Sequence, residues 1–426
     1  MSAPQPSTGI APGPRAAAAR CRFCGTDLTH TFVDLGMSPL CQTHIEPHQL
    51  NHMEPFYPLH AYVCDQCYLV QLDEYVSPSE IFSDYAYFSS YSDSWVQHAK
   101  RYTDMAVERF GLGTGNKVME IASNDGYLLQ HFRDRGIPVL GIEPAANVAQ
   151  VAVEKGIPTT VRFFGAASAQ DIAAEHGQAD LLLGNNVLAH VPKLNDFVAG
   201  MKLLLKAGGN ITMEFPHLYR LMERNQFDTI YHEHFSYLSF FTVQKVFAAH
   251  GLTLYDVEEL DTHGGSLRIY ARHTEDTAKP VTERAEALLQ REIAWGVNRL
   301  ETYASFTEQV KETKRKILEF MINAKRAHKR IAGYGAPGKG NTLLNYCGIR
   351  QDFLDYTVDR SPYKQGRYTP GTRIPILHPD RIRETKPDYL FILPWNLKDE
   401  IMSQMAHIRD WGGQFVVPIP ILKVFP

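Results

Sequence analysis

Apolar and polar positions change their period several times between residues 94 and 216. Short apolar runs predict five strands, at 117–121, 138–143, 159–164, 179–186 and 209–216. Helical patterns cover 94–110 and 127–135 and also lie between the later strands. Strands that alternate with helices form a parallel sheet, and such a sheet binds its ligand at the carboxyl ends of the strands. We therefore predict an α/β domain over 76–275, with a ligand site at that edge.

The last third of the chain repeats this kind of pattern after a long helical segment. Residues 281–325 carry apolar side chains at nearly helical spacing on a charged background, which is typical of a core-facing stripe: Tyr303, Phe306, Val310, Ile317 and Met321. A strand at 329–335, a helix at 341–347 and a strand ending in Asp359 follow. We predict a helical plus α/β domain over 276–426.

The first 75 residues differ from the rest in composition. Residues 1–20 are rich in Ala, Pro and Gly, lack the apolar core of a secretory signal and predict a disordered tail. Residues 21–75 are too few and too polar for a large core, yet they contain two C-x-x-C pairs, whose four thiolates match the tetrahedral shell of structural zinc: Cys21, Cys24, Cys64 and Cys67. Reduced free cysteines and a redox role are the alternatives. Cys41 and Cys347 are expected to be buried small hydrophobic residues.

Charge and hydropathy exclude some classes of function. The chain has 43 basic and 47 acidic residues, so it lacks the basic surplus of a protein that binds nucleic acid through phosphates. No apolar run approaches the ~18 residues of a membrane span. Six cysteines without a secretion signal favour a reducing, cytoplasmic setting. We expect neither nucleic acid nor membrane as partner; the oligomeric state is open, and a monomer is compatible with the pattern.

The turn after the first predicted strand indicates the ligand of the first α/β domain. A dinucleotide site would place G-x-G-x-x-G here, with amides directed at a diphosphate. The sequence instead has a single glycine, Gly126, with Glu120, Asn124 and Asp125 around it. Acids repel a diphosphate but suit the cationic amino group and sulfonium of S-adenosylmethionine. The alternative is that these are ordinary strand-end acids facing solvent.

Further candidates for this cofactor site follow from the same sheet. Ser123 belongs to the turn, and Glu143, at the end of the second strand, is placed to accept hydrogen bonds from ribose hydroxyls. Phe164, next to Phe163, either flanks an adenine or belongs to the core. Asn185 and Asn186 follow the fourth strand, where they could contact the methionine part of the cofactor.

The segment Tyr231-His-Glu-His-Phe-Ser-Tyr237 concentrates groups that are hard to explain by packing. His234 is a candidate general base, because the ordinary pKa of histidine lies close to neutral pH. Glu233 and Tyr231 could orient it or hydrogen-bond an oxyanion. Two alternatives are a metal site and a plain polar loop with a capping Glu. His190 follows the fourth strand and therefore lies at the same rim as a substrate, unless it is a structural histidine.

A glycine-rich loop opens the second α/β unit. Residues 333–340 match G-x-G-x-x-G, with Asp359 about 20 residues further on, as in a dinucleotide site. Pro337 removes one of the amides that a phosphate needs. We favour the diphosphate of a sugar nucleotide, bound by Gly338, Lys339 and Gly340; a dinucleotide and purely structural glycines are the alternatives. His263, in the segment 263–268, is expected in a close turn beside the same cleft.

Taken together, the order of motifs resembles the sugar C-methyltransferases, in particular the NDP-hexose 3-C-methyltransferases of deoxysugar and antibiotic pathways. The resemblance covers about 20–426 and includes C-x-x-C twice, E-I-x-S-N-D-G, N-N-V-L-A-H-V, E-F-P-H, Y-H-E-H-F-S-Y, H-G-G-S-L-R and G-Y-G-A-P-G-K-G. It implies a dTDP-linked 4-keto-deoxysugar between the middle and last domains, methylated through an enolate.

The family's site residues transfer to five positions of this chain. The resemblance implies that His234 is the base and that four side chains surround the sugar and the enolate: Tyr231, Glu233, His190 and Tyr85. Tyr85 depends on the resemblance alone. A sugar O- or N-methyltransferase and a non-catalytic, zinc-bearing scaffold are the alternative functions.

Overall fold

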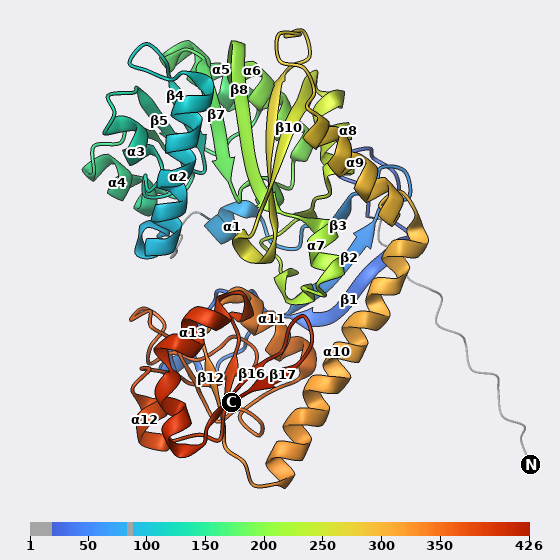
Figure 1. Cartoon of the computed structure of the whole chain (residues 1–426), viewed down its shortest axis with the longest axis vertical. Coiled ribbons are helices and arrows are strands. Elements are labelled where there is room, and N and C mark those ends of the chain that lie inside the picture. The colour runs from blue at the N-terminus through green and yellow to red at the C-terminus, as the bar shows by residue number, and fades with distance from the viewer. Residues whose placement is uncertain (1–18, 83–87) are drawn as a thin grey trace, which may run out of the picture.

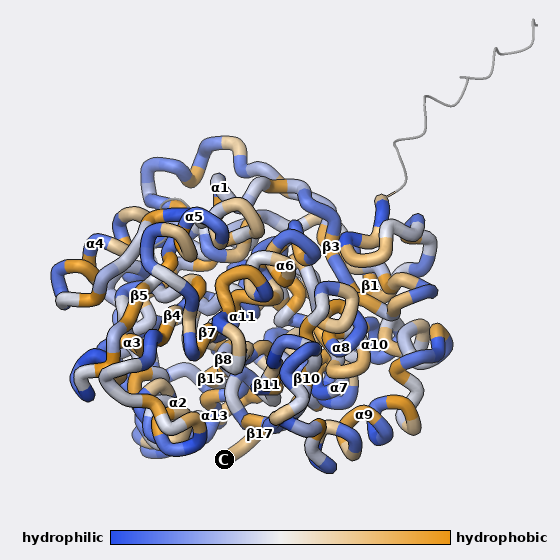
Figure 2. Tube along the Cα trace, turned by 90° about the horizontal axis from the view of Figure 1, so that it is seen from above, coloured by the Kyte–Doolittle hydropathy of each residue, from blue (hydrophilic) through white to orange (hydrophobic). Residues whose placement is uncertain are grey.

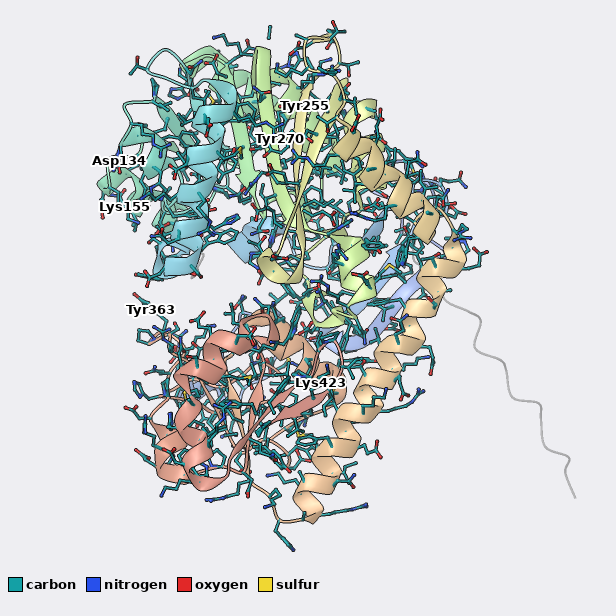
Figure 3. All side chains as sticks on the ribbon, viewed as in Figure 1. Asp134, Lys155, Tyr255, Tyr270, Tyr363 and Lys423 are labelled. Atoms are coloured by element: carbon teal, nitrogen blue, oxygen red, sulfur yellow. The ribbon has the colours of Figure 1, made fainter. Side chains whose placement is uncertain are left out.

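The computed structural model describes residues 19–82 and 88–426. Figure 1 shows two lobes, one above the other, which are joined along one side by the long helix α10 (Leu300–Arg326) and by strands β1–β3. Three sheets organise the described part of the chain, with four, seven and six strands. At the side opposite α10, the hydroxyls of Tyr91 and Tyr363 lie 3.4 Å apart, so the lobes also touch there; Figure 3 labels Tyr363.

The N-terminal module is built on an antiparallel sheet in the order β1-β2-β3-β9. Its first three strands are β1 (His30–Ser38), β2 (Tyr57–Val63) and β3 (Val70–Leu72). The fourth, β9 (Ser236–Tyr237), comes from much later in the chain and pairs Val70 with Tyr237. The end of the Y-H-E-H-F-S-Y segment is therefore part of the N-terminal sheet. The sequence pattern did not predict this pairing.

The middle sheet has the order β10-β11-β8-β7-β4-β5-β6. The five predicted strands are present and parallel: β4 (Val118–Ile121), β5 (Val139–Ile142), β6 (Thr159–Thr160), β7 (Ala179–Asn185) and β8 (Leu205–Pro216). The strand predicted at 159–164 is shortened, because only two residues pair. An antiparallel hairpin, β10 (Leu252–Leu260) and β11 (Ser266–His273), extends the sheet beyond β8 and was not predicted.

Helices cover both faces of this sheet and connect its strands (Figure 1). They are α1 (Pro78–Phe82), α2 (Asp93–Phe110), α3 (Leu129–Arg133), α4 (Ala146–Glu154), α5 (Ala166–His176), α6 (Leu194–Leu204), α7 (Leu218–Glu223) and α8 (Phe240–Ala249). Short 3-10 turns that matter for the site are η2 (Ser89–Tyr91), η3 (Leu188–His190), η4 (Phe227–Thr229) and η5 (Thr262–Gly264). The segment 263–268 comprises the tip of the β10–β11 hairpin and the first residues of β11, in agreement with the close turn that the sequence predicted.

The helical segment predicted at 281–325 forms two helices, α9 (Glu283–Trp295) and α10. The break lies at Gly296, whose φ of 106° is a conformation that side chains rarely adopt. The predicted apolar stripe of α10 is buried. Its Phe306 ring stacks on Phe32 of β1, with ring centroids 4.7 Å apart. The helix thus joins the C-terminal unit to the N-terminal sheet.

The C-terminal sheet has the order β14-β13-β12-β15-β16-β17. Its strands are β12 (Ile331–Tyr334), β13 (Thr357–Val358), β14 (Ile376–Leu377), β15 (Tyr389–Ile392), β16 (Gln414–Val417) and β17 (Lys423–Phe425); only the last pairs antiparallel. The helices are α11 (Gly338–Cys347), α12 (Arg381–Thr385) and α13 (Lys398–Gln404). This is a second Rossmann-like unit, as predicted.

The buried apolar residues join the parts of the chain into shared cores. One core runs from the N-terminal sheet through α10 into the C-terminal sheet, while the cysteine end of the N-terminal module contributes to the core of the middle sheet. Hydrophobic stretches follow the inner elements and hydrophilic stretches follow the outer loops (Figure 2). In the part of the chain that the structure describes, no helix has the length and apolar character to cross a membrane.

Candidate active site and zinc centre

Four cysteine sulfurs meet at the end of the N-terminal module. The Sγ atoms of Cys21, Cys24, Cys64 and Cys67 all lie within 4.8 Å of one another, and Cys21–Cys67 and Cys24–Cys64 are each 3.5 Å apart. Tetrahedral zinc with Zn–S bonds of about 2.3 Å places its sulfurs roughly 3.8 Å apart, so the group fits zinc with a closed shell. Gln71 Nε2 lies 3.2 Å from Cys21 Sγ and would support the thiolate.

The Y-H-E-H segment does not form a second metal site. Among residues 19–82 and 88–426, the cysteine group is the only set of three or more metal-ligating side chains with converging atoms. His232 turns away and places its Nε2 3.1 Å from the carbonyl oxygen of Pro58. The metal alternative for 231–234 is therefore not supported by the geometry.

A cavity of about 860 Å³ lies between the lobes and is lined by residues from all three parts of the chain. This volume is typical of sites for small molecules and cofactors. Twelve of the predicted site residues line it: Asn124, Glu143, Phe164, Asn185, Asn186, His190, Tyr231, Glu233, His234, His263, Gly338 and Lys339. Some of the residues predicted for the cofactor, for catalysis and for the substrate thus share one space, whereas Glu120, Ser123, Asp125, Gly126 and Gly340 do not line it. Tyr85 lies outside the described residues.

The cofactor end of the cavity is organised around Glu143. Its two carboxylate oxygens accept hydrogen bonds from the backbone N–H groups of Asn124 and Ala145, both at 2.9 Å. These bonds fix the carboxylate at the carboxyl end of β5 and shape the turn after β4, in which Asn124 has a φ of 51°. Burial raises the pKa of Glu143 above its ordinary value.

Glu120 lies beneath this turn and is fully buried. Both of its carboxylate oxygens lack a hydrogen-bond partner within the described chain, and burial raises its pKa well above the ordinary value. An unpartnered buried acid is costly unless a cation or donor from a ligand approaches it. A cationic cofactor at this edge of the sheet therefore fits the residues present.

Three other residues of the turn support its shape and do not line the cavity. Asp125 forms an ion pair with Lys155 at 3.0 Å and accepts a hydrogen bond from Ser90. Gly126 has a φ of 76°, and a Cβ there would lie 2.9 Å from a side-chain carbon of Ile157. Ser123 is fully buried beside β5. The structure thus gives these three residues a part in the shape of the turn, and their predicted contact with the cofactor stays a prediction.

The catalytic candidates surround His234. The Nδ1 of His234 lies 2.9 Å from the carbonyl oxygen of Thr229, so Nδ1 carries the proton and Nε2 is left as the acceptor. The ring of Tyr231 lies 4.0 Å and the ring of His190 4.7 Å from that of His234, centroid to centroid. Burial lowers the pKa of His234 well below its ordinary value and that of His190 to about 4. Both rings are therefore neutral at neutral pH.

Glu233 points to the same space but has a different environment. Its side chain is buried, and the thiol of Cys41 donates to its Oε1 at 3.7 Å. Burial raises the pKa of Glu233 to about 7, so this carboxyl titrates near neutral pH. The cavity thus contains a neutral histidine base next to an acid that can hold or release a proton in the same pH range.

The glycine-rich loop of the C-terminal unit closes the opposite wall. Lys339 is half-buried, donates from Nζ to Asn396 at 2.8 Å and lies over the ring of Trp395 at 4.7 Å. Trp395 Nε1 in turn donates to Asp228 at 2.7 Å. Gly340 does not line the cavity, because it packs where a Cβ would lie 2.9 Å from Leu393. This glycine is needed for packing rather than for direct contact with a ligand.

The carboxylate of Asp359 is not available to bind a ribose, because both of its oxygens already accept hydrogen bonds. Its carboxylate accepts hydrogen bonds from the backbone N–H groups of Ala336 and Ser361, both at 2.8 Å, and Lys364 lies 3.5 Å away. The acid that a dinucleotide site would direct at its ligand is thus used within the loop. His263, at the hairpin tip, has its Nε2 3.0 Å from Asn186 Nδ2, so the hairpin contacts the segment that follows β7.

Sequence reasoning missed several residues that line the cavity. Trp95 begins the first turn of α2, Arg162 precedes the Phe pair, and Gln42 comes from the long β1–β2 loop. None of them belongs to a motif. The signal in the sequence was an aromatic residue near the start of the helix that precedes the first strand of the sheet, which is too common to be informative.

Comparison with known proteins identifies the family. A model of a C-methyltransferase C-terminal domain matches residues 261–420, one of a zinc binding domain matches 21–82, and one of a methyltransferase domain matches 95–257. The C-methyltransferase NovU of Streptomyces niveus is 36% identical over 404 residues, which are 95% of this chain and 96% of that protein. The chain belongs to this family of C-methyltransferases. The predicted enzyme class, S-adenosylmethionine and zinc are confirmed.

Two solved structures similar to this C-methyltransferase each cover less than half of its chain. The PH0226 protein of Pyrococcus horikoshii matches 47% of this chain and 99% of its own, with a TM-score of 0.37 and 16% identity. The magnesium protoporphyrin IX methyltransferase of Synechocystis, solved with bound S-adenosylhomocysteine, matches 41% of this chain and 82% of its own, with a TM-score of 0.33 and 14% identity.

Proposed function

We propose that this C-methyltransferase methylates C3 of a dTDP-linked 4-keto-deoxysugar in deoxysugar and antibiotic biosynthesis. The observation that supports it most is the neutral His234, whose free Nε2 faces the cavity that also holds the cofactor residues. Methylation at carbon needs a carbon nucleophile, and a neighbouring ketone provides one when a base removes the adjacent proton. A 4-keto sugar offers such a proton at C3.

Each residue near His234 has a role in the proposed proton transfer. His234 Nε2 takes the proton from C3, the C–H electron pair forms the C3–C4 double bond, and the carbonyl electrons move to the oxygen. Tyr231 and His190 are close enough to His234 to donate hydrogen bonds to that oxyanion. Glu233, with its pKa of about 7, can accept or return a proton between cycles.

S-adenosylmethionine, when bound, supplies a methyl group that is already activated by its positive sulfur. Glu143 would accept hydrogen bonds from its ribose hydroxyls, and Phe164 would pack on its adenine. Glu120 is buried beneath the turn and does not line the cavity, so it would not contact the cationic end directly. Asn185 and Asn186 line the cavity between these residues and the His234 cluster. Zinc, held by the four cysteines, has no open position and contributes to structure only.

The nucleotide end of the substrate would lie against the C-terminal unit. Helix α11 begins at Gly338, and the amino end of a helix favours an anion because its first N–H groups are unpaired. Lys339, which is half-buried and lines the cavity, adds a positive charge at the same place. Both features suit a diphosphate, and the internal use of Asp359 makes a dinucleotide a poorer fit.

The deciding experiment is NMR on the zinc-loaded protein with carbon-13-methyl S-adenosylmethionine and a dTDP-4-keto-2,6-dideoxyhexose. We expect a new methyl signal coupled to a ring carbon of the sugar. A methyl signal on oxygen or nitrogen would overturn the enolate mechanism and leave an O- or N-methyltransferase. No transfer to any 4-keto-deoxysugar of a panel, despite tight cofactor binding, would overturn the substrate class.

A further inference from the structure

Cys41 lies where the three parts of the chain meet at the wall of the cavity. It is a buried residue of the loop between β1 and β2, and it is not among the four zinc ligands. Its Sγ lies 3.7 Å from Glu233 Oε1, and its carbonyl oxygen accepts a 2.7 Å hydrogen bond from Asn341 Nδ2 of α11. A Cβ on Gly338 would come within 2.9 Å of the same sulfur. Cys41 therefore contacts both the Y-H-E-H segment and the glycine-rich loop.

The surroundings explain why a thiol is suited to this position. Burial and the nearby carboxyl of Glu233 raise the pKa of Cys41 well above its ordinary value, so the sulfur keeps its proton. Tyr237 of β9 and Lys364 of the C-terminal unit also face Cys41, and the His190 ring bonds to the main chain of Glu233. A protonated thiol can donate a weak hydrogen bond to a carboxylate without adding a charge.

We propose that Cys41 is a positioning residue, whose thiol holds the Glu233 carboxyl at the wall of the cavity while its main chain anchors α11. The N-terminal module then contributes to the active site directly, beyond carrying zinc. Only the expected effect of Cys41 on catalysis rests on the proposed function. The contact between the Cys41 thiol and the Glu233 carboxyl does not depend on which substrate is bound. The donated bond favours the ionised form of Glu233, so its loss should make this carboxyl harder to ionise.

Infrared spectroscopy can observe this contact without any turnover. Of the six cysteines in the sequence, four bind zinc as thiolates and have no S–H bond, which leaves Cys41 and Cys347 as the sources of S–H stretching bands. Cys347 is buried in α11 and is a matched control. Cys41→Ala and Cys347→Ala, each checked for zinc content and unfolding temperature, assign the two bands. Both bands lie in a spectral window free of amide and water absorption.

We expect the Cys41 band to move to lower frequency as the pH rises through about 7, because the ionised Glu233 accepts a stronger hydrogen bond. The Cys347 band should not move, and Glu233→Gln should abolish the movement of the Cys41 band. A Cys41 band that does not respond to pH, or that responds equally in Glu233→Gln, would overturn the contact. Both results are obtained whether or not the proposed sugar is a substrate.

Catalysis is tested separately once a substrate turns over. Glu233→Gln identifies the limb of the kcat profile that belongs to Glu233. We expect this limb to move to higher pH in Cys41→Ala by up to about one pH unit, by less in Cys41→Ser and not at all in Cys347→Ala. A limb that stays in place in Cys41→Ala, with kcat lowered at every pH, would reduce Cys41 to a packing residue.

Discussion

At the scale of single residues, main-chain hydrogen bonds set the chemistry of the site. The carbonyl of Thr229 fixes the tautomer of His234, and two backbone N–H groups fix the carboxylate of Glu143. The tautomer of His234 and the orientation of the Glu143 carboxylate are thus set before any ligand binds. Each role can therefore be tested by a substitution that keeps the shape of the side chain and changes its chemistry.

We expect His234→Asn to lower the rate of methyl transfer by roughly 100-fold or more, the usual contribution of a general base. Asparagine can still donate to the Thr229 carbonyl, so the loop should keep its conformation. Calorimetry should show unchanged binding of S-adenosylmethionine. His48→Asn, an exposed histidine of the β1–β2 loop, is the control and should keep full activity. A His234→Asn protein with the wild-type rate would exclude His234 as the base.

Glu143→Gln should weaken the binding of S-adenosylmethionine by about tenfold, since an amide nitrogen cannot accept one of the two backbone bonds and the charge is lost. The dissociation constant is measured by calorimetry on the zinc-loaded protein. Glu154→Gln, at the exposed end of α4, keeps the same change of charge away from the cavity and should bind normally. Equal affinity in the two variants would contradict a role of Glu143 at the cofactor.

The residue types of the site could be predicted, but not all of their directions. Asp125 and Gly340 lie within the expected motifs, and the fold uses them to pair with Lys155 and to pack on Leu393. A motif states which side chains are present at a turn, while the packing of neighbouring helices decides which of them face the ligand. Cys41 and Gln42 could not be predicted, because only the tertiary structure brings their loop to the cavity.

At the scale of elements, the periodicity of apolar residues predicted the long and regular helices and strands. The stripe on α10 is buried as expected, because residues at helical spacing share one face. The break at Gly296 and the strand β9 were missed. A strand of two residues has no detectable period, and it forms only because β3 offers an edge for it to pair with.

Phe306→Ala should lower the free energy of unfolding by about 3–5 kcal/mol, since the fully buried ring leaves a cavity against Phe32. Urea unfolding followed by circular dichroism measures the change. Glu308→Ala, exposed on the same helix, should change stability by less than about 0.5 kcal/mol. A loss in Phe306→Ala no larger than in the control would mean that α10 is not held by this contact.

At the scale of the whole molecule, the zinc module is coupled to the catalytic loop. Strand β3 follows the ligand Cys67 and pairs with β9, which begins two residues after His234. Removal of zinc should therefore reduce activity although the metal takes no part in the reaction. The coupling runs through main-chain hydrogen bonds of one sheet, so it does not depend on the identity of the substrate.

We expect Cys64→Ser to lose stoichiometric zinc, to unfold at a temperature lower by more than about 10 °C and to lose at least ~90% of methyl transfer. Atomic absorption, calorimetric scanning and the NMR assay measure these changes. Cys347→Ser should retain the metal and most of the activity. If Cys64→Ser lost its zinc and remained fully active, the sheet would not transmit the effect of the metal.

The pairing of β3 with β9 also has a consequence for biosynthesis. The ribosome releases β1, β2 and β3 long before it synthesises β9, so the newly made module exposes the edge of β3 until most of the middle domain has emerged. An exposed edge is a template for pairing with another chain. Residues 21–82 produced alone should therefore aggregate even when zinc is supplied. Addition of a peptide that contains the sequence of β9 should keep them monomeric, because the peptide would pair with the exposed edge of β3.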